Sequence, residues 1–523
     1  MGWLKRMVGA RTQRDAESKA ETFVALCVAT DGYDLIWDFC LQSQSDYCAK
    51  HGIEYRLVRG VSDQLNGKWI KLREAADLLK SGHTVLVVDA DVQITRDTPH
   101  FSAAMLDEDR SIFIANGISG RANSGVMMLR GTRAIEFLET CLANKDKPVN
   151  PENFVTTDGE NGHIIEALQL DSFVTERGIL SNEWNCTLPE KASSAFFRHY
   201  TNRLRSALDE GLFETGNEVS IAPKSQSEAA EHAAWIAHKA TRKDLLSRLE
   251  MDDVSYSIFK DNILAMSGKF TYPDMITDTI NGWVWRYEFA SGMLERPTSI
   301  LFRRLSSPDS VFIDGGANAG YFSIIMSELL SSGRILAIEP HPDNFNVLCK
   351  NLPGETVTCA QVALSDEDGE LDLFQGNGHS SSTIWEAAGM SQRRIPVSVT
   401  TIDKLAADHG LSRVDFLKLD IEGAEPNALR GAKSTLEGSE NIVVIVESNP
   451  RLLAAGGSSV LELIKQMSQI GFVGRIVRDD LRLGPTGYAP SSATINIIFA
   501  RPARWKTIVS LLGSGPIDLL SSS

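Results

Sequence analysis

The sequence of 523 residues lacks the features that mark secreted, redox and membrane-spanning proteins. Its seven cysteines are an odd number and none lies in a Cys-x-x-Cys pair, which argues against a disulfide framework and a structural zinc site. No run approaches the roughly 18 to 20 apolar residues that a helix needs to cross a bilayer. Internal repeats and low-complexity tracts are also absent from the sequence. These absences favour a globular protein of a reduced cytoplasm.

Positive charge is scarce as well. The chain has 52 Lys and Arg against 68 Asp and Glu, a net charge of -16, which argues against a general nucleic-acid binder. Residues 1–14 are basic with interleaved apolar side chains, but they lack the apolar core of a signal peptide. They suit a frayed tail better than an interfacial helix, so peripheral contact with the inner face of a membrane remains an alternative.

The length predicts two to four domains at roughly 100 to 200 residues each, and we interpret the chain as two large α/β domains. A region of weaker pattern separates them and contains a helix rich in Ala, Glu and Lys. We expect a basic tail at 1–19, a first α/β domain at 20–207, a helical connector at 208–265, a second α/β domain at 266–505 and a C-terminal tail at 506–523.

Strand and helix patterns alternate in the first domain, which predicts an α/β sheet. The important strand is 83–88, because it runs directly into Asp89-Ala90-Asp91. Residues i and i+2 of an extended chain point to the same side, so both carboxylates can face one divalent cation beyond the sheet. Mg²⁺ or Mn²⁺ bound there would bridge and neutralise the oxygens of a nucleotide diphosphate.

Four further segments follow this pair in order. They are Ala122–Leu129, which contains Asn-Ser-Gly, then Thr157–His163, Asn182–Asn185 and Phe196–Tyr200. Together with the Asp-x-Asp pair, the series resembles the GT-A class of nucleotide-sugar glycosyltransferases over residues 20 to 205. The resemblance implies a GT-A nucleotide-diphospho-sugar transferase-like fold, a nucleotide-sugar donor and a glycan or lipid-linked glycan acceptor.

Site residues of the first domain follow from that resemblance. It implies that Asp89, Asp91 and His199 bind the metal, and that Lys68 or Lys71 meets the diphosphate. Asn123, Ser124 and Gly125 would line the donor sugar. Asp158 or Glu160 would act near the acceptor hydroxyl, as a general base or an orienting group. Local structural roles compete with these: Asn123 could cap a turn, Asp158 could cap a helix and His199 could be a core histidine.

The second domain is organised around Val311–Phe322, which indicates a buried strand, a glycine-rich turn and the start of a helix. Gly315, Gly316 and Gly320 allow the backbone to approach a ligand closely. Glu339 ends the next apolar run, where a carboxylate can accept hydrogen bonds from ribose hydroxyls. The spacing Asp-x-Gly-x-Asn-x-Gly differs from the dinucleotide and P-loop patterns, so we expect a nucleoside cofactor without a pyrophosphate. Further strands are predicted at 335–338, 357–364, 414–419 and 442–446.

The acidic segment Val414–Glu425 completes a second resemblance. Together with the glycine turn it resembles the FkbM family of S-adenosylmethionine-dependent O-methyltransferases over roughly 287 to 450. A Rossmann-like class I methyltransferase fold is implied, and the cofactor S-adenosylmethionine would contact Asp314, Gly316, Asn318, Gly320 and Glu339.

Asp420 and Glu422 would lie at the catalytic face of this domain by the same resemblance. Proton transfer or substrate contact is favoured for this pair over a second metal, because no His accompanies it. Helix capping is the competing role, more readily for Glu425. His379 could be a base, but a solvated loop histidine is the favoured interpretation.

We therefore expect a bifunctional enzyme. One domain would transfer a sugar from a nucleotide-sugar donor, and the other would methylate a sugar hydroxyl, in bacterial polysaccharide or glycoconjugate synthesis. The main alternative is a methyltransferase whose first domain only binds a glycan or a nucleotide sugar. A methyltransferase acting on a lipid or small secondary metabolite is a weaker option, because a fold says little about the acceptor.

Overall fold

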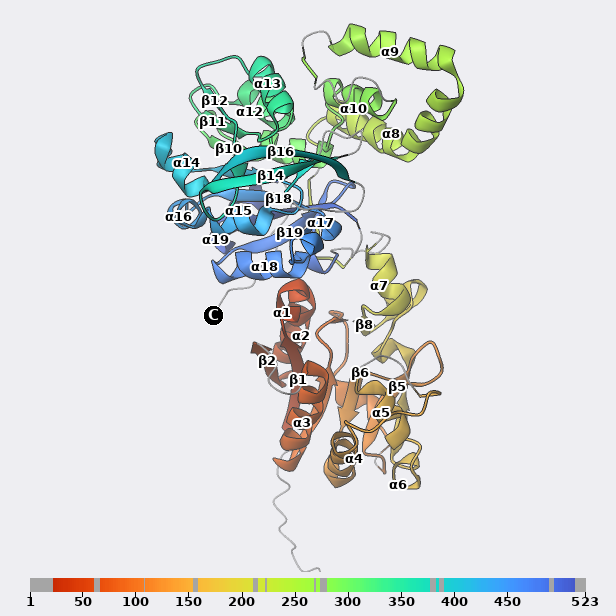
Figure 1. The fold of residues 1–523 in the computed structure, drawn as a ribbon. Coiled ribbons are helices and arrows are strands. Elements are labelled where there is room, and N and C mark those ends of the chain that lie inside the picture. The colour runs from red at the N-terminus through yellow and green to blue at the C-terminus, as the bar shows by residue number, and fades with distance from the viewer. Residues whose placement is uncertain are drawn as a thin grey trace, which may run out of the picture. The chain divides into compact units, whose positions relative to one another are not determined.

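The computed structural model describes residues 22–60, 66–107, 109–153, 159–209, 215–221, 223–267, 270–272, 280–376, 382–384, 390–488 and 493–512 (Figure 1). The chain divides into two compact units. The first contains the described residues up to Asp31 and Cys40–Arg205, and the second contains Gly32–Phe39 and the residues from Ser206 onward. Among the described residues, no helix is both long and apolar enough to span a bilayer.

The first unit is built on a six-stranded mixed sheet with the order β2-β1-β3-β6-β5-β7. β1 is parallel to both β2 and β3, β6 is antiparallel to β3 and β5, and β7 is parallel to β5. A separate antiparallel pair joins β4 and β8. The strands are β1 (Thr22–Thr30), β2 (Glu54–Gly60), β3 (His83–Val88), β4 (Val92–Ile94), β5 (Ile112–Asn116), β6 (Ala122–Leu129), β7 (Arg177–Leu180) and β8 (Phe197–His199).

Helices cover the sheet of the first unit because alternate strand residues point to opposite faces. In β3, Val85 and Val87 pack into one core cluster with α3 and α4, whereas Leu86 and Val88 pack into a second cluster with α2. The helices are α2 (Asp38–His51), α3 (Gly67–Lys80), α4 (Gly131–Ala143), α5 (Asn161–Ala167) and α6 (Asp171–Val174), with 3-10 turns η1 (Phe101–Ala104), η2 (Asn182–Trp184) and η3 (Pro189–Ser194). The carboxyl end of β3 is therefore held by packing on both faces.

The second unit contains a nine-stranded sheet with the order β12-β11-β10-β17-β18-β21-β19-β20-β9. The first five strands in this order are parallel, and β21 returns antiparallel between β18 and β19. Its strands are β9 (Val219–Ser220), β10 (Val311–Gly315), β11 (Arg334–Ile338), β12 (Val357–Ala360), β17 (Phe416–Leu419), β18 (Val443–Ser448), β19 (Val473–Val477), β20 (Arg482–Gly484) and β21 (Ile495–Ala500).

A smaller four-stranded sheet has the order β13-β16-β14-β15. Its strands are β13 (Ala363–Leu364), β14 (Gly369–Gly376), β15 (Ser382–Thr383) and β16 (Met390–Thr400). The sequence predicted one strand at 357–364, but the structure divides this stretch into β12 and β13, which belong to different sheets. A polar break at 361–362 separates them, so the apolar run does not correspond to one strand.

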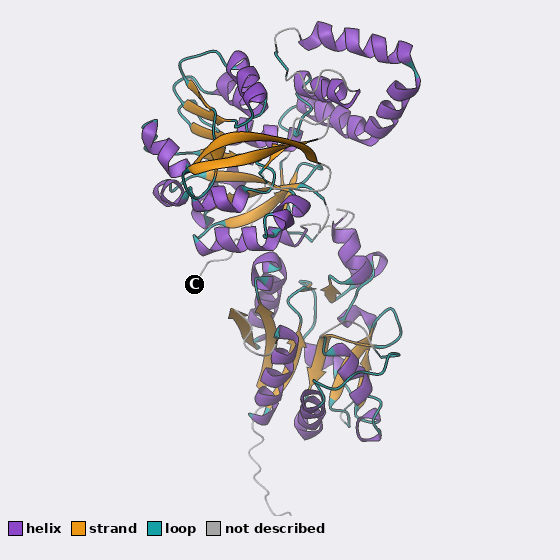
Figure 2. Cartoon of the chain, in the orientation of Figure 1, coloured by secondary structure: helices purple, strands orange, loops and turns teal. Residues whose placement is uncertain are grey.

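Helices of the second unit lie around these sheets, as the secondary-structure view shows (Figure 2). They are α1 (Tyr33–Ile36), α7 (Asn202–Asp209, at the boundary of the units), α8 (Gln226–Met251), α9 (Asp253–Ser267), α10 (Ile280–Ala290), α11 (Arg296–Leu305), α12 (Tyr321–Leu329), α13 (Pro342–Asn351), α14 (Ile402–Asp408), α15 (Glu425–Arg430), α16 (Lys433–Gly438), α17 (Pro450–Ala455), α18 (Val460–Gln469) and α19 (Pro502–Leu512), with the 3-10 turn η5 (Thr486–Tyr488).

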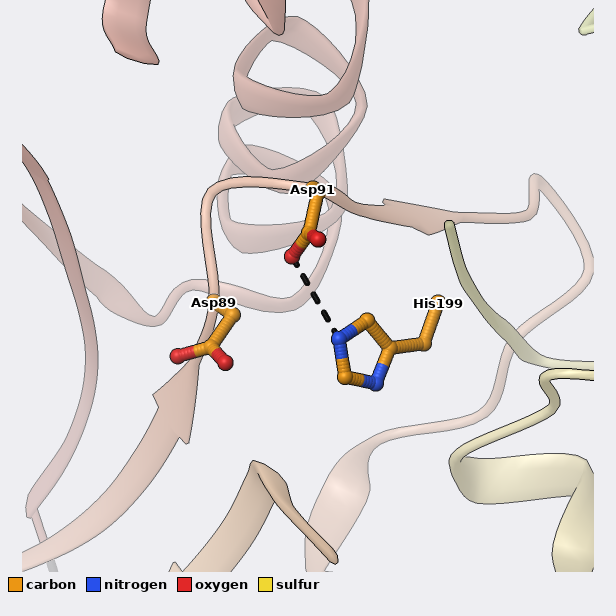
Figure 3. Close-up of side chains that lie close together, drawn as sticks. All are labelled: Asp89, Asp91 and His199. Carbon is orange, nitrogen blue, oxygen red and sulfur yellow. Dashed lines mark ion pairs between the residues drawn. The ribbon is translucent and has the colours of Figure 1, made fainter. Parts of the chain in front are cut away.

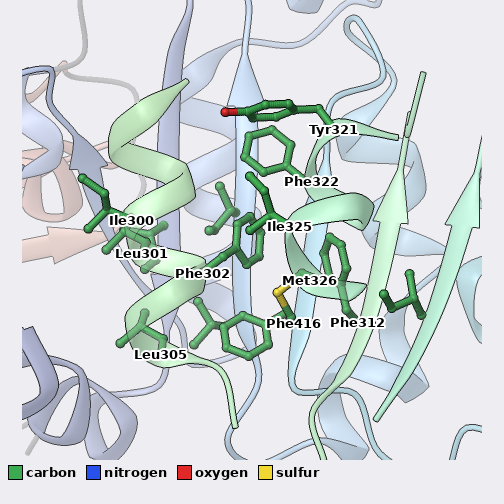
Figure 4. Close-up of a cluster of buried hydrophobic side chains, with 14 of the residues drawn as sticks. Ile300, Leu301, Phe302, Leu305, Phe312, Tyr321, Phe322, Ile325, Met326 and Phe416 are labelled. Carbon is green, nitrogen blue, oxygen red and sulfur yellow. The ribbon is translucent and has the colours of Figure 1, made fainter. Parts of the chain in front are cut away.

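The main core of the second unit positions its glycine turn. Phe302 on α11 is fully buried, and its ring contacts Phe312 on β10, Phe322 on α12 and Phe416 on β17 at centroid distances of 5.2, 5.4 and 5.7 Å. Figure 4 shows side chains of α11 facing those of α12 across this cluster. The aromatic contacts hold β10, β17 and α12 in place, and the glycine turn connects two of these elements.

Two predicted boundaries differ from the structure. Helix α8, predicted as part of a separate connector, belongs to the second unit, because the indole of Trp235 is buried and donates to the carbonyl of Met293 at 2.7 Å. The tail predicted from residue 506 is wrong for its first residues, since α19 continues to Leu512. Trp505 in that helix is fully buried and donates to the carbonyl of Val473 at 2.9 Å.

Candidate functional sites

Three potential metal ligands converge at the carboxyl end of β3 in the first unit. Asp89 and Asp91 follow the strand directly, and His199 is the last residue of β8. One ligand atom of each lies within 4.8 Å of the others, and Nε2 of His199 lies 3.4 Å from Oδ1 of Asp91 (Figure 3). Carboxylate oxygens and an imidazole nitrogen are donors that suit Mn²⁺ and, for the oxygens, Mg²⁺. The donor set therefore fits a divalent cation.

Backbone pairing sets the spacing of this trio. The amide of Asp89 donates to the carbonyl of Gly125 at 2.9 Å, and the amide of Tyr200 donates to the carbonyl of Asp91 at 2.9 Å. In the β4–β8 ladder, Val92 lies opposite His199. The two aspartates are thus tied to different neighbouring strands, and the ligand geometry depends on the sheet rather than on side chains alone.

A chain of amides orients the imidazole. Nδ1 of His199 lies 2.9 Å from Oδ1 of Asn185, so with this amide oxygen as acceptor the ring proton resides on Nδ1. Nε2 faces Asp91 at 3.4 Å and would offer its lone pair to a cation bound there, as metal-binding histidines do. The amide of Asn185 donates in turn to the carbonyl and Oδ1 of Asn123, at 3.2 and 3.1 Å. Asn123 therefore helps to position His199.

Lys71 on α3 is buried between two carboxylates. Its Nζ lies 2.7 Å from both Oδ1 of Asp89 and Oε1 of Glu160, and the hydroxyl of Ser124 donates to Glu160 at 2.7 Å. Burial opposes ionisation of Glu160, but the ammonium of Lys71 holds the pKa of that carboxyl below its ordinary value. Burial raises the pKa of Asp89, and Lys71 counters this effect. Lys71 thus compensates the charge of Asp89 and of Glu160.

The remaining predictions for this unit have mixed outcomes. Glu160 is 4% exposed and contacts Lys71 and Ser124, a placement that favours a positioning role over proton transfer. Asp158 lies outside the described residues. Gly125 packs directly against the imidazole, because a Cβ added there would lie 2.1 Å from Cε1 of His199. The structure therefore brings the metal trio, Lys71 and the Asn-Ser-Gly segment together.

In the second unit the predicted cofactor residues meet where the strand order reverses. β10 has β11 on one side and β17 on the other, and α/β sheets bind ligands beyond the carboxyl ends of strands at such a point. A cavity opens there. Its lining includes Asp314, Gly316, Asn318, Glu339, Lys418, Asp420, Glu422 and Glu447.

Two glycines of the turn are required by close contacts. Gly316 has φ 81°, and a Cβ at this position would lie 1.9 Å from the carbonyl oxygen of Asp420. Gly320, with φ 91°, precedes α12, and its Cβ would lie 2.9 Å from Cδ1 of Leu348. A side chain would force the turn away from β17 or α13, so these glycines fix the floor of the cavity.

Glu339 fastens the turn from the neighbouring strand. Its carboxylate accepts hydrogen bonds from the backbone amides of Asn318 and His341, both at 2.9 Å. Burial nevertheless raises the pKa of Glu339 to about 7. Asp314 is also buried, which raises its pKa, and it accepts a hydrogen bond from Ser323 at 2.6 Å. These residues fit a nucleoside cofactor, since a buried carboxylate beside a glycine cradle can bind ribose hydroxyls.

Lys418 on β17 is the centre of a second buried charge cluster. Its Nζ lies 2.9 Å from Oδ2 of Asp420 and 4.6 Å from the centroid of the Phe322 ring. One carboxylate oxygen each of Asp420, Glu295 and Glu447 lies within 4.8 Å of the others. Burial raises the pKa of Asp420, but Lys418 outweighs it and holds that pKa below its ordinary value. Burial and the charge of Asp420 instead raise the pKa of Glu447 well above normal.

The predicted pairing of Asp420 with Glu422 differs from this arrangement. Glu422 has φ 54°, so the chain is not extended there and the two carboxylates do not share one side as a strand would place them. Burial followed by the charge of Asp420 raises the pKa of Glu422 to about 8. Glu425 accepts from the amides of Ile421 and Gly423, both at 3.1 Å, so it holds the turn before α15 and does not cap that helix, whose N-cap is Ala424.

Sequence reasoning missed several residues of these sites. Asn185 orients His199, and Lys418 and Glu295 adjoin Asp420. Glu447 was expected at the ligand-binding edge of the sheet, because it ends the predicted strand 442–446, but its place beside Asp420 was not predicted. Lys418 gave a signal as a lysine inside an apolar strand, because buried charges are rare without a partner. Glu295 had none, since it precedes α11 and comes from a distant part of the chain. His379 lies outside the described residues.

Comparisons with known proteins bear mainly on the second unit. Residues 314–473 match the methyltransferase FkbM domain. The 2-O-methyltransferase NoeI of Sinorhizobium fredii is 25% identical over 223 residues, which are 38% of this chain and 91% of NoeI. The hexuronic acid methyltransferase AglP of Haloferax volcanii is 27% identical over 170 residues, 31% of this chain and 65% of AglP, so the chain spans just under two thirds of that relative. An FkbM methyltransferase domain in the second unit is thereby supported.

One solved structure among the matches is of a different class of enzyme. It is a glycosyltransferase involved in glycosylation of the major capsid of PBCV-1, with 15% identity and a TM-score of 0.30 over 35% of this chain and 97% of that one. The glycosyltransferase assignment of the first unit stays a prediction.

The contact between Gly125 and His199 gives a test of the metal trio. Gly125→Ala should weaken Mn²⁺ binding by on the order of 10-fold to 100-fold, because the new methyl group must displace the imidazole. Mn²⁺ titration monitored by electron paramagnetic resonance measures this. Gly438→Ala is the control, since no atom lies within 4 Å of a Cβ at that position. Equal Mn²⁺ affinity in the wild type and Gly125→Ala would contradict the assignment.

The raised pKa of Glu339 predicts pH-dependent cofactor binding. Ribose hydroxyls donate to the ionised carboxylate, and the free protein is protonated at Glu339 below about pH 7. The affinity for S-adenosylhomocysteine should therefore fall about tenfold for each pH unit below 7 and level off above it. Calorimetric titration between about pH 5.5 and 8.5 measures the slope. Glu339→Gln should bind weakly without this slope; an unchanged slope in the variant would refute the role of Glu339.

Proposed function

We propose that the second unit is an S-adenosylmethionine-dependent O-methyltransferase that acts on a hydroxyl group of a sugar. The observation that carries the proposal is that the glycine turn, Glu339 and the Lys418 cluster line one cavity at the reversal of strand order. The FkbM domain match supports the methyltransferase chemistry. The names of NoeI and AglP, a 2-O-methyltransferase and a hexuronic acid methyltransferase, support a sugar as the acceptor.

The cofactor residues are those that the cavity brings together. Gly316, Asn318 and Asp314 would border the nucleoside, and Glu339 would accept the ribose hydroxyls. Gly320 acts from outside the cavity lining, by letting the turn pack closely on Leu348 of α13. When bound, S-adenosylmethionine supplies a methyl group on a positively charged sulfur. The protein must then orient the acceptor oxygen and remove its proton.

Glu447 is our proposed proton acceptor. Its carboxyl adjoins Asp420, whose charge is compensated by Lys418 at 2.9 Å. Glu447 carries a proton while Asp420 is ionised, so as Glu447 takes the proton of the acceptor hydroxyl it would pass its own proton to the carboxylate of Asp420. Lys418 supplies the positive charge of the cluster, which favours proton transfer over a second metal. Asp420 thus keeps the catalytic role expected for it, and Glu422 remains a candidate contact to the substrate.

We further propose that the first unit transfers a sugar from a nucleotide-sugar donor with Mn²⁺ or Mg²⁺. The metal trio, its orienting amides and the order of motifs support this function. Asp89, Asp91 and His199 would hold the metal near the donor diphosphate. If the transferred sugar is then methylated, the methylated hydroxyl can no longer accept another sugar. The chain would stop growing at that hydroxyl, which agrees with capping in polysaccharide synthesis. The alternative is a first unit that binds the sugar nucleotide without turning it over.

Glu447→Gln tests the methyltransferase chemistry. The amide cannot accept the proton, so kcat should fall by roughly 10²-fold to 10⁴-fold while S-adenosylhomocysteine binds as before. Transfer of radiolabelled methyl from S-adenosylmethionine to a panel of methyl glycosides measures the rate, and calorimetry measures the binding. Glu437→Gln, an exposed glutamate on α16, is the control. A normal rate in Glu447→Gln would remove this residue from the mechanism.

A double substitution tests the first unit. Wild-type protein with Mn²⁺ should release nucleotide diphosphate from one member of a panel of nucleotide sugars, and Asp89→Ala with Asp91→Ala should reduce the release at least about 100-fold, since the leaving diphosphate loses its cation. The matched control is Asp77→Ala with Asp146→Ala, two exposed aspartates. Donor binding without release in the wild type would favour the binding-module alternative.

A further inference from the structure

A second cavity of about 630 Å³ adjoins the cofactor cavity within the second unit. Residues of α8, α10 and α11 line one side of it, and β19 and the segment leading into β21 line the other. Leu294, Glu295 and Glu447 line both cavities, and we call these three residues the shared wall. A ligand in the second cavity can therefore contact Glu295 and Glu447, which also line the cofactor cavity. We call the second cavity the acceptor groove.

The basic side chains that line the acceptor groove each form an ion pair with an acidic side chain of the same lining. Lys239 forms an ion pair with Asp479, Arg242 with Glu288 at 2.8 Å, and Arg478 with Asp480 at 2.8 Å. These are the three Lys and Arg residues among its lining, and each has a carboxylate partner there.

Two more acidic side chains, Glu295 and Glu447, stand in the shared wall, and burial raises the pKa of both, so neither adds a full negative charge. A carboxylate or phosphate ligand would find no Lys or Arg among the described lining residues that lacks a carboxylate partner. The groove accordingly disfavours an anion.

An uncharged, polyhydroxylated ligand suits this lining better. A carboxylate or guanidinium group in an ion pair can still make further hydrogen bonds, as acceptor or donor, to the hydroxyl groups of a ligand. Leu294, Pro297, Ile476 and Ile495 add apolar surface for the C–H faces of a sugar ring. The groove volume falls within the range of sites that enclose a small organic ligand.

We propose that the acceptor groove binds an uncharged sugar residue and presents one of its hydroxyl groups to the shared wall. The proposal rests on the methyltransferase function proposed above and narrows its acceptor to a neutral sugar. At the wall the acceptor oxygen meets Glu447, so the groove determines which hydroxyl is methylated. Hexuronic acids, in contrast, belong to the ligands that it excludes.

Saturation-transfer NMR on the full chain with S-adenosylhomocysteine tests this proposal. The probes are the methyl glycosides of glucose, galactose, rhamnose and fucose, and methyl glucuronide as the charged match of the glucoside. At least one neutral glycoside should bind. If the glucoside is among those that bind, the glucuronide should bind at least about tenfold more weakly than the glucoside. Binding of none of the neutral glycosides, or stronger binding of the glucuronide, would overturn the proposal.

Tryptophan substitutions in the acceptor groove test whether the glycoside binds there. Thr494 and Ala493 are exposed residues of the groove, so Thr494→Trp or Ala493→Trp should fill it and reduce glycoside binding at least about tenfold. Thr507→Trp, at an exposed position of α19 outside both cavities, should bind like the wild type. Undiminished glycoside binding in both groove variants, folded as judged by thermal unfolding, would refute the groove as the site.

Calorimetry with S-adenosylhomocysteine on the same samples separates the two proposals. If the glycoside binds and the tryptophan variants block it while S-adenosylhomocysteine does not bind, the cofactor assignment fails and the groove stands. If S-adenosylhomocysteine binds and the glycosides do not, the groove proposal fails alone.

Discussion

Burial of one lysine among carboxylates is the interaction on which both sites depend. Lys71 lies between Asp89 and Glu160 in the first unit, and Lys418 lies beside Asp420 in the second. An isolated buried charge costs several kcal/mol, so each carboxylate is tolerated only because the ammonium compensates it. Removing either lysine would leave uncompensated carboxylates in a low-dielectric environment. The surrounding strands could then keep their positions only if those carboxylates took up protons or became exposed to solvent. The geometry of each site is therefore coupled to a lysine that need not touch a substrate.

Local patterns made much of the fold predictable. The strand 83–88 was predicted with the bounds that the structure has, because its apolar run ends at a polar residue within the sequence itself. The glycine turn was equally readable, since Gly316 and Gly320 require positive φ at fixed spacing from a strand. These features depend on residues a few positions apart.

The rest of the sites depends on contacts between distant segments. Glu295 reaches the Asp420 cluster because α11 packs on β10 and β17 through Phe302, and Asn185 reaches His199 because its neighbour Cys186 pairs with β8. The spacing of apolar residues along the sequence does not encode contacts of this kind. For Glu422 the local conformation itself was predicted wrongly. We expected an extended chain after β17, but the turn into α15 places this residue at positive φ.

The two sites differ in what completes their charge balance. In the first unit, one lysine is shared between Asp89 and Glu160 while Asp91 adjoins His199, so the cluster retains negative charge on the side where the ligand atoms converge. A divalent cation compensates that charge and brings its own chemistry to a diphosphate. In the second unit, Lys418 faces more carboxylates than it can neutralise, and burial raises the pKa of Glu447 and of Glu295. Protons complete that balance, and because Asp420 stays ionised, the pair of Asp420 and Glu447 can still take up one proton from a hydroxyl group.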